Sequence, residues 1–90
     1  MQVPTKRKRK WYLDSGCSRH MTGDSNIFVE LQSLNGGKVF FEGNNKGKIV
    51  GKGTVEIGGL KINDVSLVKG FNYNLISISQ LCDSGFRINF

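Results

Sequence analysis

The chain has 90 residues, which is enough for one small domain with a thin core of its own. Its 13 Lys and Arg residues outnumber its 7 Asp and Glu residues, but five of the cations form the run Lys6–Lys10, and the remainder is close to neutral. The chain contains no stretch of ~18 apolar residues and no apolar signal-peptide core, which argues against a membrane protein and predicts a cytoplasmic one, with a nuclear location as the alternative.

The basic run marks the first segment. Residues 1–10 are polar and charged, so we predict a basic flexible linker in front of a folded domain at residues 11–90. Because the positive charge belongs to this arm and not to a folded face, nucleic acid is an expected partner only through Lys6–Lys10. A solvated linker is the first interpretation of the run, with a phosphate-binding arm and a nuclear-import signal as open alternatives.

Two local patterns follow the arm. The apolar run Trp11–Leu13 ends at the turn Asp14-Ser15-Gly16, which predicts a buried strand that carries this turn to the interior. Further on, Asp24 is a candidate N-cap, and apolar residues at helical spacing predict about two helical turns that end at Leu31.

The middle of the chain alternates between apolar and polar residues, which predicts two β-hairpins. The first covers Lys38–Val50 and has its tip in Gly43–Gly47, with Asn35–Gly37 as the competing tip. The second joins a strand at Thr54–Ile57 to a strand at Leu60–Val68 through the two glycines between them.

The C-terminal part changes its period. Apolar residues from Leu75 to Leu81 follow helical spacing, and Gly85 stands where a C-cap glycine would end that helix. The alternating residues Phe86–Phe90 then predict a closing strand. Strands outnumber helices in this interpretation, so the predicted class is mainly β with one short C-terminal helix.

Cysteine and histidine residues are scarce. Cys17 and Cys82 are too few for a disulfide framework, and His20 cannot complete a four-ligand zinc site with them. We therefore expect two reduced thiols, no metal site and no organic cofactor, with His20 as a structural hydrogen-bonding residue near the turn at Asp14.

Asp14 is the residue on which the predicted catalytic chemistry depends. Aspartic proteolysis uses two carboxylates that share one proton, and a chain of this length with one strand-delivered Asp-Ser-Gly turn must bring the second carboxylate from another copy across a two-fold axis. The tripeptide alone is weak support, because it also occurs at Asp83-Ser84-Gly85, where it fits the end of the C-terminal helix.

Three stretches carry a resemblance to a known family: Trp11–Thr22, Gly51–Val55 and Asn74–Leu81. They are similar to retroviral-type aspartic proteases, most closely those of copia-type retrotransposons. The resemblance implies a retropepsin-like fold that a flap hairpin closes over the active site. It also implies a homodimeric endopeptidase that processes its own retrotransposon polyprotein, as an extended peptide, inside a cytoplasmic virus-like particle.

The same resemblance assigns roles to residues. Asp14 is the candidate catalytic residue, and Ser15 and Gly16 are expected to support its loop. The substrate-binding candidates are Cys17, Ser18, Gly43, Asn44, Asn45, Lys46 and Gly47. The dimer-interface candidates are Phe86, Arg87, Ile88, Asn89 and Phe90. The chain departs from the retroviral pattern at Ser18 and Ile78, where an acid and an arginine that form an ion pair are usual, so we expect the dimer to depend on other contacts.

Two other functions remain open at this point. The domain could be a catalytically silent member of the same fold that serves dimerisation or peptide binding. It could also be a nucleic-acid-binding module that acts through the basic arm. A pH–rate profile separates the first of these from a working carboxylate pair, and deletion of residues 1–10 tests the second.

Overall fold

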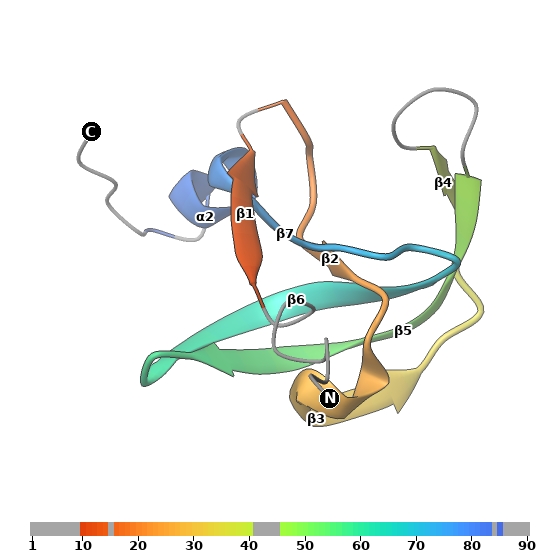
Figure 1. The fold of residues 1–90 in the computed structure, drawn as a ribbon, viewed down its shortest axis with the longest axis horizontal. Helices are drawn as coiled ribbons and strands as arrows, with labels where there is room; N and C mark the ends of the chain where they lie inside the picture. The colour runs from red at the N-terminus through yellow and green to blue at the C-terminus, as the bar shows by residue number, and fades with distance from the viewer. Residues whose placement is uncertain (1–9, 15, 41–45, 84, 86–90) are drawn as a thin grey trace, which may run out of the picture.

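The computed structural model describes residues 10–14, 16–40, 46–83 and 85, so residues 1–9 of the predicted linker lie outside the described residues. The described part is mainly β, as predicted, with seven strands in one open mixed sheet and one short α-helix (Figure 1). The strands are β1 (Trp11–Asp14), β2 (Met21–Thr22), β3 (Phe28–Ser33), β4 (Lys38–Phe40), β5 (Lys46–Ile57), β6 (Leu60–Lys69) and β7 (Asn74–Ser77). The helices are the 3-10 turn η1 (Ser25–Ile27) and α2 (Ile78–Asp83).

The sheet has the strand order β1-β7-β2-β6-β5-β3, and β4 pairs with β5 as well. The β5–β6 hairpin forms its long central part, and Gly58 and Gly59 make the turn with φ angles of 57° and 84°, which glycine adopts without steric cost. This hairpin confirms the second one predicted from the sequence. The first half of β5 and its second half were predicted as separate strands, but they form one strand that shifts register between Ile49 and Gly51 and between Gly53 and Val55.

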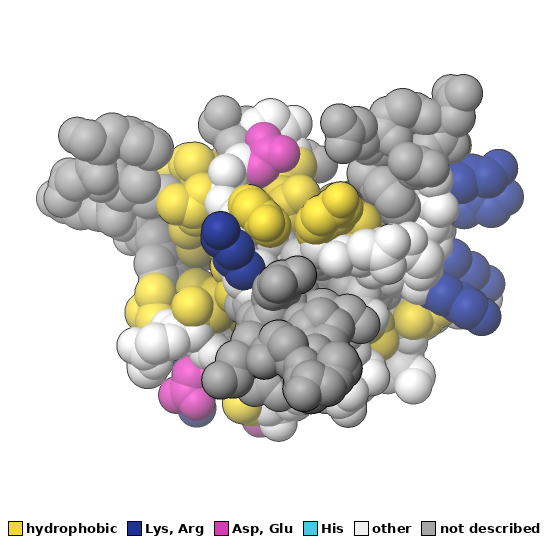
Figure 2. Space-filling model, viewed as in Figure 1, with side chains coloured by type: hydrophobic (Ala, Val, Ile, Leu, Met, Phe, Trp, Pro, Cys, Tyr) yellow, Lys and Arg dark blue, Asp and Glu magenta, His cyan; other side chains and the backbone are white. Residues whose placement is uncertain are grey.

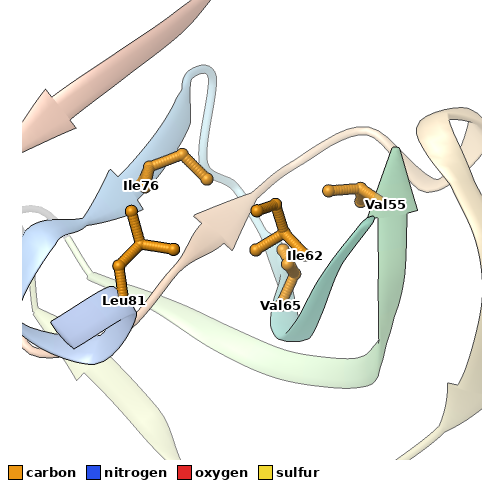
Figure 3. Close-up of a cluster of buried hydrophobic side chains, with 5 residues drawn as sticks. All are labelled: Val55, Ile62, Val65, Ile76 and Leu81. Atoms are coloured by element: carbon orange, nitrogen blue, oxygen red, sulfur yellow. The ribbon is translucent and has the colours of Figure 1, made fainter. Parts of the chain in front are cut away.

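Two apolar clusters form the core. Five buried side chains converge between the β5–β6 hairpin, β7 and α2 (Figure 3): Val55, Ile62, Val65, Ile76 and Leu81. A second cluster consists of Met21, Ile49, Val68 and Phe71. Both clusters draw on β5 and β6. Buried residues alternate along the first half of β5, whereas the core residues of β6, Ile62, Val65 and Val68, are three positions apart.

The predicted helix between Asp24 and Leu31 is wrong. Asp24 does cap a turn, since its carboxylate accepts a hydrogen bond from the Asn26 backbone N–H at 2.9 Å, but that 3-10 turn ends at Ile27. The chain then continues as β3, antiparallel to β5, with Leu31 opposite Gly53. Backbone pairing with a long neighbouring strand therefore outweighs the weak helical spacing of these few apolar residues.

The predicted C-terminal helix is shorter than expected. Leu75 and Ile76 belong to β7, which is buried between β1 and β2, and α2 begins only at Ile78. Gly85 ends the helix as predicted, with a φ of 93° and a hydrogen bond from its N–H to the Cys82 carbonyl oxygen at 3.1 Å. The predicted strand Phe86–Phe90 lies outside the described residues.

Strand β1 is not the buried strand that its apolar sequence predicted. It stands at the end of the strand order and pairs with β7 alone among the described residues. Trp11 packs against the core, but Tyr12 is 47% exposed and Leu13 is 63% exposed. In the described ranges, no helix has the length and apolar character needed to cross a membrane.

Candidate functional site

Asp14 is the last residue of β1, in register with Ser77 of the parallel strand β7. Its carboxylate is held from its own loop, because the Gly16 backbone N–H donates to Oδ1 at 2.7 Å. A Cβ atom at position 16 would lie 3.2 Å from the same oxygen, which is a crowded contact. A glycine two residues after the aspartate therefore lets the backbone N–H approach the carboxylate. Ser15, between them, lies outside the described residues.

The loop that follows Asp14 is tied to the start of α2. The Ser77 hydroxyl donates to the Cys17 carbonyl oxygen at 2.7 Å and accepts from the Gln80 backbone N–H at 3.0 Å. The Gln80 side-chain oxygen in turn accepts from the His20 backbone N–H at 3.0 Å. Ser77 is fully buried and caps α2, and Gln80 lies in the first turn of that helix. Both ends of the loop are therefore attached to the start of α2.

A cleft of about 930 Å³ opens beside Asp14. Its lining includes Arg19 from the loop after Asp14 and two aromatic residues from the segment after β6, Phe71 and Tyr73. In the view of Figure 2, apolar side chains gather at the upper part of the molecule, where β1 ends in Figure 1. Among the described lining residues Asp14 is the single carboxylate, so the described part of one chain brings one such group to this cleft.

Exposed apolar side chains surround the aspartate. Tyr12 and Leu13 precede it on the edge strand, and Tyr73, which is 58% exposed, lies with its ring centroid 6.2 Å from that of Tyr12. An exposed edge strand that carries apolar side chains is suited to association with another chain. This apolar surface thus adjoins Asp14.

The Asp-Ser-Gly loop, the β5–β6 hairpin and the strand-to-helix junction all lie within residues 11–86, which match the family model of the Pol polyprotein, beta-barrel domain. This chain belongs to that family. The putative transposon Ty5-1 protein of Saccharomyces cerevisiae is 38% identical to it over 77 residues, which make up 84% of this chain and 52% of that protein. The chain spans about half the length of this curated relative, and no solved structure matches it. It is a region of a retrotransposon Pol polyprotein.

His20 of this Pol domain is a buried structural residue, as the sequence suggested. Its ring is 1% exposed, and Nδ1 accepts a hydrogen bond from the Ser77 backbone N–H at 2.9 Å. An accepting Nδ1 requires the neutral ring. Burial lowers the pKa of His20 from its usual value, and the negative charge of Asp64 opposes that shift without reversing it.

We expect the free energy of unfolding to fall as the pH drops below the ordinary histidine pKa of 6.5. In this pH range His20 binds a proton in the unfolded chain but not in the folded chain, so acid favours unfolding. The effect is at most about 1.4 kcal/mol per pH unit for one group. Denaturant titrations at pH 7.5 and 5.5 measure the effect. The His20→Asn variant keeps an acceptor near the Nδ1 position but does not titrate, so its loss between the two pH values should be smaller. An equal loss in both proteins would contradict the role of His20.

Cys17 was predicted to bind substrate, and it lines the cleft beside Asp14. Burial raises the pKa of Cys17, and the charge of Asp14 raises it further. Its thiol lies 3.5 Å from the Arg19 carbonyl oxygen and 3.8 Å from that of Asp14. A protonated thiol that faces carbonyl oxygens is a poor nucleophile, so the carboxylate and not the sulfur is the reactive candidate in this cleft.

The predicted flap hairpin exists as a hairpin, with corrected bounds. Phe40 of β4 pairs with Lys46 and Val39 pairs with Gly47, so Lys46 and Gly47 belong to β5 and not to the tip. Lys46 lines the cleft and Gly47 is buried. The competing tip at Asn35–Gly37 is wrong, because Gly36 and Gly37 are hydrogen-bonded along β5 through Ile49. The predicted tip residues Gly43, Asn44 and Asn45 lie outside the described residues.

The structure also places residues that the sequence did not single out. Ser18, a predicted substrate-binding residue, lines the cleft together with Phe71, Tyr73 and Arg19, which were not predicted. No sequence signal identified the two aromatic residues. A sequence signal did exist for Ser77, because Ser77-Ile78-Ser79-Gln80 fits the S-x-x-Q capping pattern that marks a helix start. The predicted interface residues Phe86, Arg87, Ile88, Asn89 and Phe90 lie outside the described residues.

Proposed function

We propose that this Pol domain is one subunit of a homodimeric aspartic endopeptidase that cuts its own polyprotein. The observation that carries the proposal is the setting of Asp14. Its carboxylate ends an edge strand, is held by the Gly16 N–H at 2.7 Å and faces a cleft that has no second carboxylate among its described lining residues. A second Asp14, from another copy across a two-fold axis, completes the pair that the reaction needs.

The exposed surface around Asp14 supports this assembly. Leu13 is 63% exposed and Tyr12 is 47% exposed, on a strand whose outer edge has no partner among the described residues. Burying these side chains against a second copy removes apolar surface from water and brings the two aspartates together. The same contact compensates for the small core of a 90-residue chain.

The pair of Asp14 carboxylates shares one proton. The ionised carboxylate takes a proton from a water molecule, whose oxygen bonds to the carbonyl carbon of the peptide, while the protonated carboxyl group gives its proton to the carbonyl oxygen. The resulting tetrahedral diol then transfers a proton to the amide nitrogen, the C–N bond breaks, and an acid and an amine leave. No oxidant, metal or organic cofactor takes part in this sequence.

The substrate binds as an extended strand between the β4–β5 hairpin and the loop after Asp14. An extended peptide offers its backbone groups to hairpin residues, and its side chains enter pockets on alternate sides. Phe71 and Tyr73 form an aromatic wall of the cleft, their ring centroids 5.9 Å apart, so an apolar substrate side chain is favoured there.

Dilution tests the proposal. We expect the cleavage rate per chain, measured on a peptide that spans a junction of the polyprotein, to fall as the protein is diluted and to follow the dimer fraction seen by sedimentation. The rate should also reach its maximum on the acid side of neutrality, as a carboxylate pair requires. A rate per chain that stays constant where sedimentation shows only monomer would overturn the dimer. A dimer with no cleavage at any pH would instead favour the silent dimerisation and peptide-binding module.

A further inference from the structure

The register of three neighbouring strands places lysines in a row. Lys38 of β4 is directly opposite Lys48 of β5, and Lys48 is directly opposite Lys69 of β6. Directly opposed residues point to the same face of a sheet, and strands lie about 4.8 Å apart, so the three charges line up across about 10 Å. All three residues are exposed.

Two more side chains share this face. Lys46 lies two residues before Lys48 on β5, and Phe40 is directly opposite Lys46. Phe40 is 67% exposed, the highest value among the large apolar residues that the structure describes as exposed. We call the set Lys38, Phe40, Lys46, Lys48 and Lys69 the lysine face. The intervening residues, among them Ile49 and Val68, are buried on the opposite side of the sheet.

The lysine face is not explained by stability. Like charges directly opposite each other on adjacent strands repel, and an exposed phenylalanine gains nothing from solvent. No acidic residue occupies a described position in β4, in the first three residues of β5 or at the end of β6. Lys and Arg side chains gather at the edge of the molecule by the β4–β5 hairpin (Figure 2). Outside the basic arm the chain is nearly neutral, yet four of its six lysines there lie on this one surface.

We propose that the lysine face binds single-stranded nucleic acid. The four ammonium groups pair with backbone phosphates, and a base stacks on the Phe40 ring. An exposed aromatic ring among cations suits a single strand better than a duplex, whose bases are already stacked. It also suits a nucleic acid better than an acidic peptide, because every base has a flat face to offer.

This surface is separate from the basic arm, through which alone the sequence predicted nucleic-acid contact. Lys48 and Lys69 do not line the cleft beside Asp14, although Lys38, Phe40 and Lys46 do. Binding through Lys48 and Lys69 is therefore independent of the peptidase proposal. It can be measured in the Asp14→Asn variant, in which no cleavage is expected.

The experiment compares matched lysine variants in the Asp14→Asn chain of 90 residues. Fluorescence anisotropy of a labelled 15-nucleotide oligo(U) gives the affinity at several salt concentrations. Lys48→Gln should weaken binding about five- to tenfold at 50 mM salt and lower the slope of log K against log salt by about 0.7. Lys61→Gln removes the same charge from the far end of the β5–β6 hairpin and should change the affinity less than twofold. Equal losses in the two variants would overturn the site.

Phe40→Leu tests the stacking contact and keeps an apolar side chain. It should weaken oligo(U) binding about tenfold and leave binding to a duplex of the same length unchanged. The thermal midpoint of Lys48→Gln should equal or exceed that of the parent, since the substitution relieves repulsion. Two results would overturn the proposal: an unchanged oligo(U) affinity in Phe40→Leu, or an oligo-glutamate peptide that binds as tightly as oligo(U), which would assign the face to acidic peptides.

Discussion

Replacing Asp14 with asparagine is expected to lower the peptide-cleavage rate by about 10²–10⁴-fold while the fold stays intact. The asparagine side-chain oxygen can still accept the hydrogen bond from the Gly16 N–H, which is 2.7 Å from Oδ1 in the parent, so the loop keeps its geometry. An amide cannot take a proton from water, so the paired site loses its base. Steady-state kinetics on a junction peptide measure the loss, and circular dichroism checks the fold.

The chain supplies its own matched control. Asp83 begins the second Asp-Ser-Gly tripeptide at the end of α2, so Asp83→Asn makes the same chemical change in the same local sequence, and the parent rate is expected. At a constant total concentration of chains, an equal mixture of Asp14→Asn and parent chains should keep about a quarter of the activity of the parent alone, because mixed dimers hold one carboxylate. A similar loss in Asp83→Asn, or half of the activity in the mixture, would contradict the shared site.

The long hairpin was predictable because its signals are local. Two glycines at positions 58 and 59 stand between alternating segments, and both adopt the positive φ angles that such a turn requires. The mainly β class followed from the same alternation. The approach of the Gly16 N–H to Asp14 was also predictable, since both residues belong to one turn.

The first predicted helix is wrong and the C-terminal one begins later than predicted, because neighbouring strands decide the structure of these segments. Leu75 and Ile76 are consecutive apolar residues, which helical spacing accommodates, but they form a strand with partners on both sides, β1 and β2. A strand covered in this way has no polar alternation to reveal it. Leu31 likewise follows helical spacing and pairs across the sheet with Gly53, a partner 22 positions further along the chain.

The contacts that hold the loop after Asp14 could not be predicted from the sequence, for the same reason. His20 and Ser77 are 57 residues apart in the sequence and meet only because β1 and β2 flank β7. The lysine face depends on register in an even stricter way, since a shift of one residue between β4 and β5 would move Lys38 away from Lys48. Composition gave the number of lysines and could not show that they line up.

Acid affects the proposed enzyme in two opposite ways. A pair of carboxylates that shares one proton works best on the acid side of neutrality. The buried His20, whose pKa is lowered by burial, makes the same acid range less favourable for the folded chain. His20 bonds to the Ser77 N–H, so its protonation would strain the junction that holds the active-site loop. The activity maximum should therefore be bounded on its acid side by loss of the loop as well as by protonation of the pair.

Replacing Ser77 with alanine is expected to lower the free energy of unfolding by about 2–4 kcal/mol. The hydroxyl is fully buried and makes two bonds, to the Cys17 carbonyl oxygen at 2.7 Å and from the Gln80 N–H at 3.0 Å. Alanine removes the N-cap of α2 and leaves the Cys17 carbonyl oxygen, in the loop after Asp14, without its donor. Denaturant titration at pH 7.5 measures the change, at a pH where His20 stays neutral in both proteins.

Ser79 provides the control for this substitution. It is exposed on α2, two residues from Ser77, and Ser79→Ala should change stability by less than about 0.5 kcal/mol. The cleavage rate of Ser77→Ala should also fall at temperatures where the protein is still fully folded, because the loop from Cys17 to His20 loses one of its two attachments to the helix. A stability loss equal to that of Ser79→Ala would show that the hydroxyl does not hold the loop. A full cleavage rate in folded Ser77→Ala would show that the position of Asp14 does not depend on the strand-to-helix junction behind it.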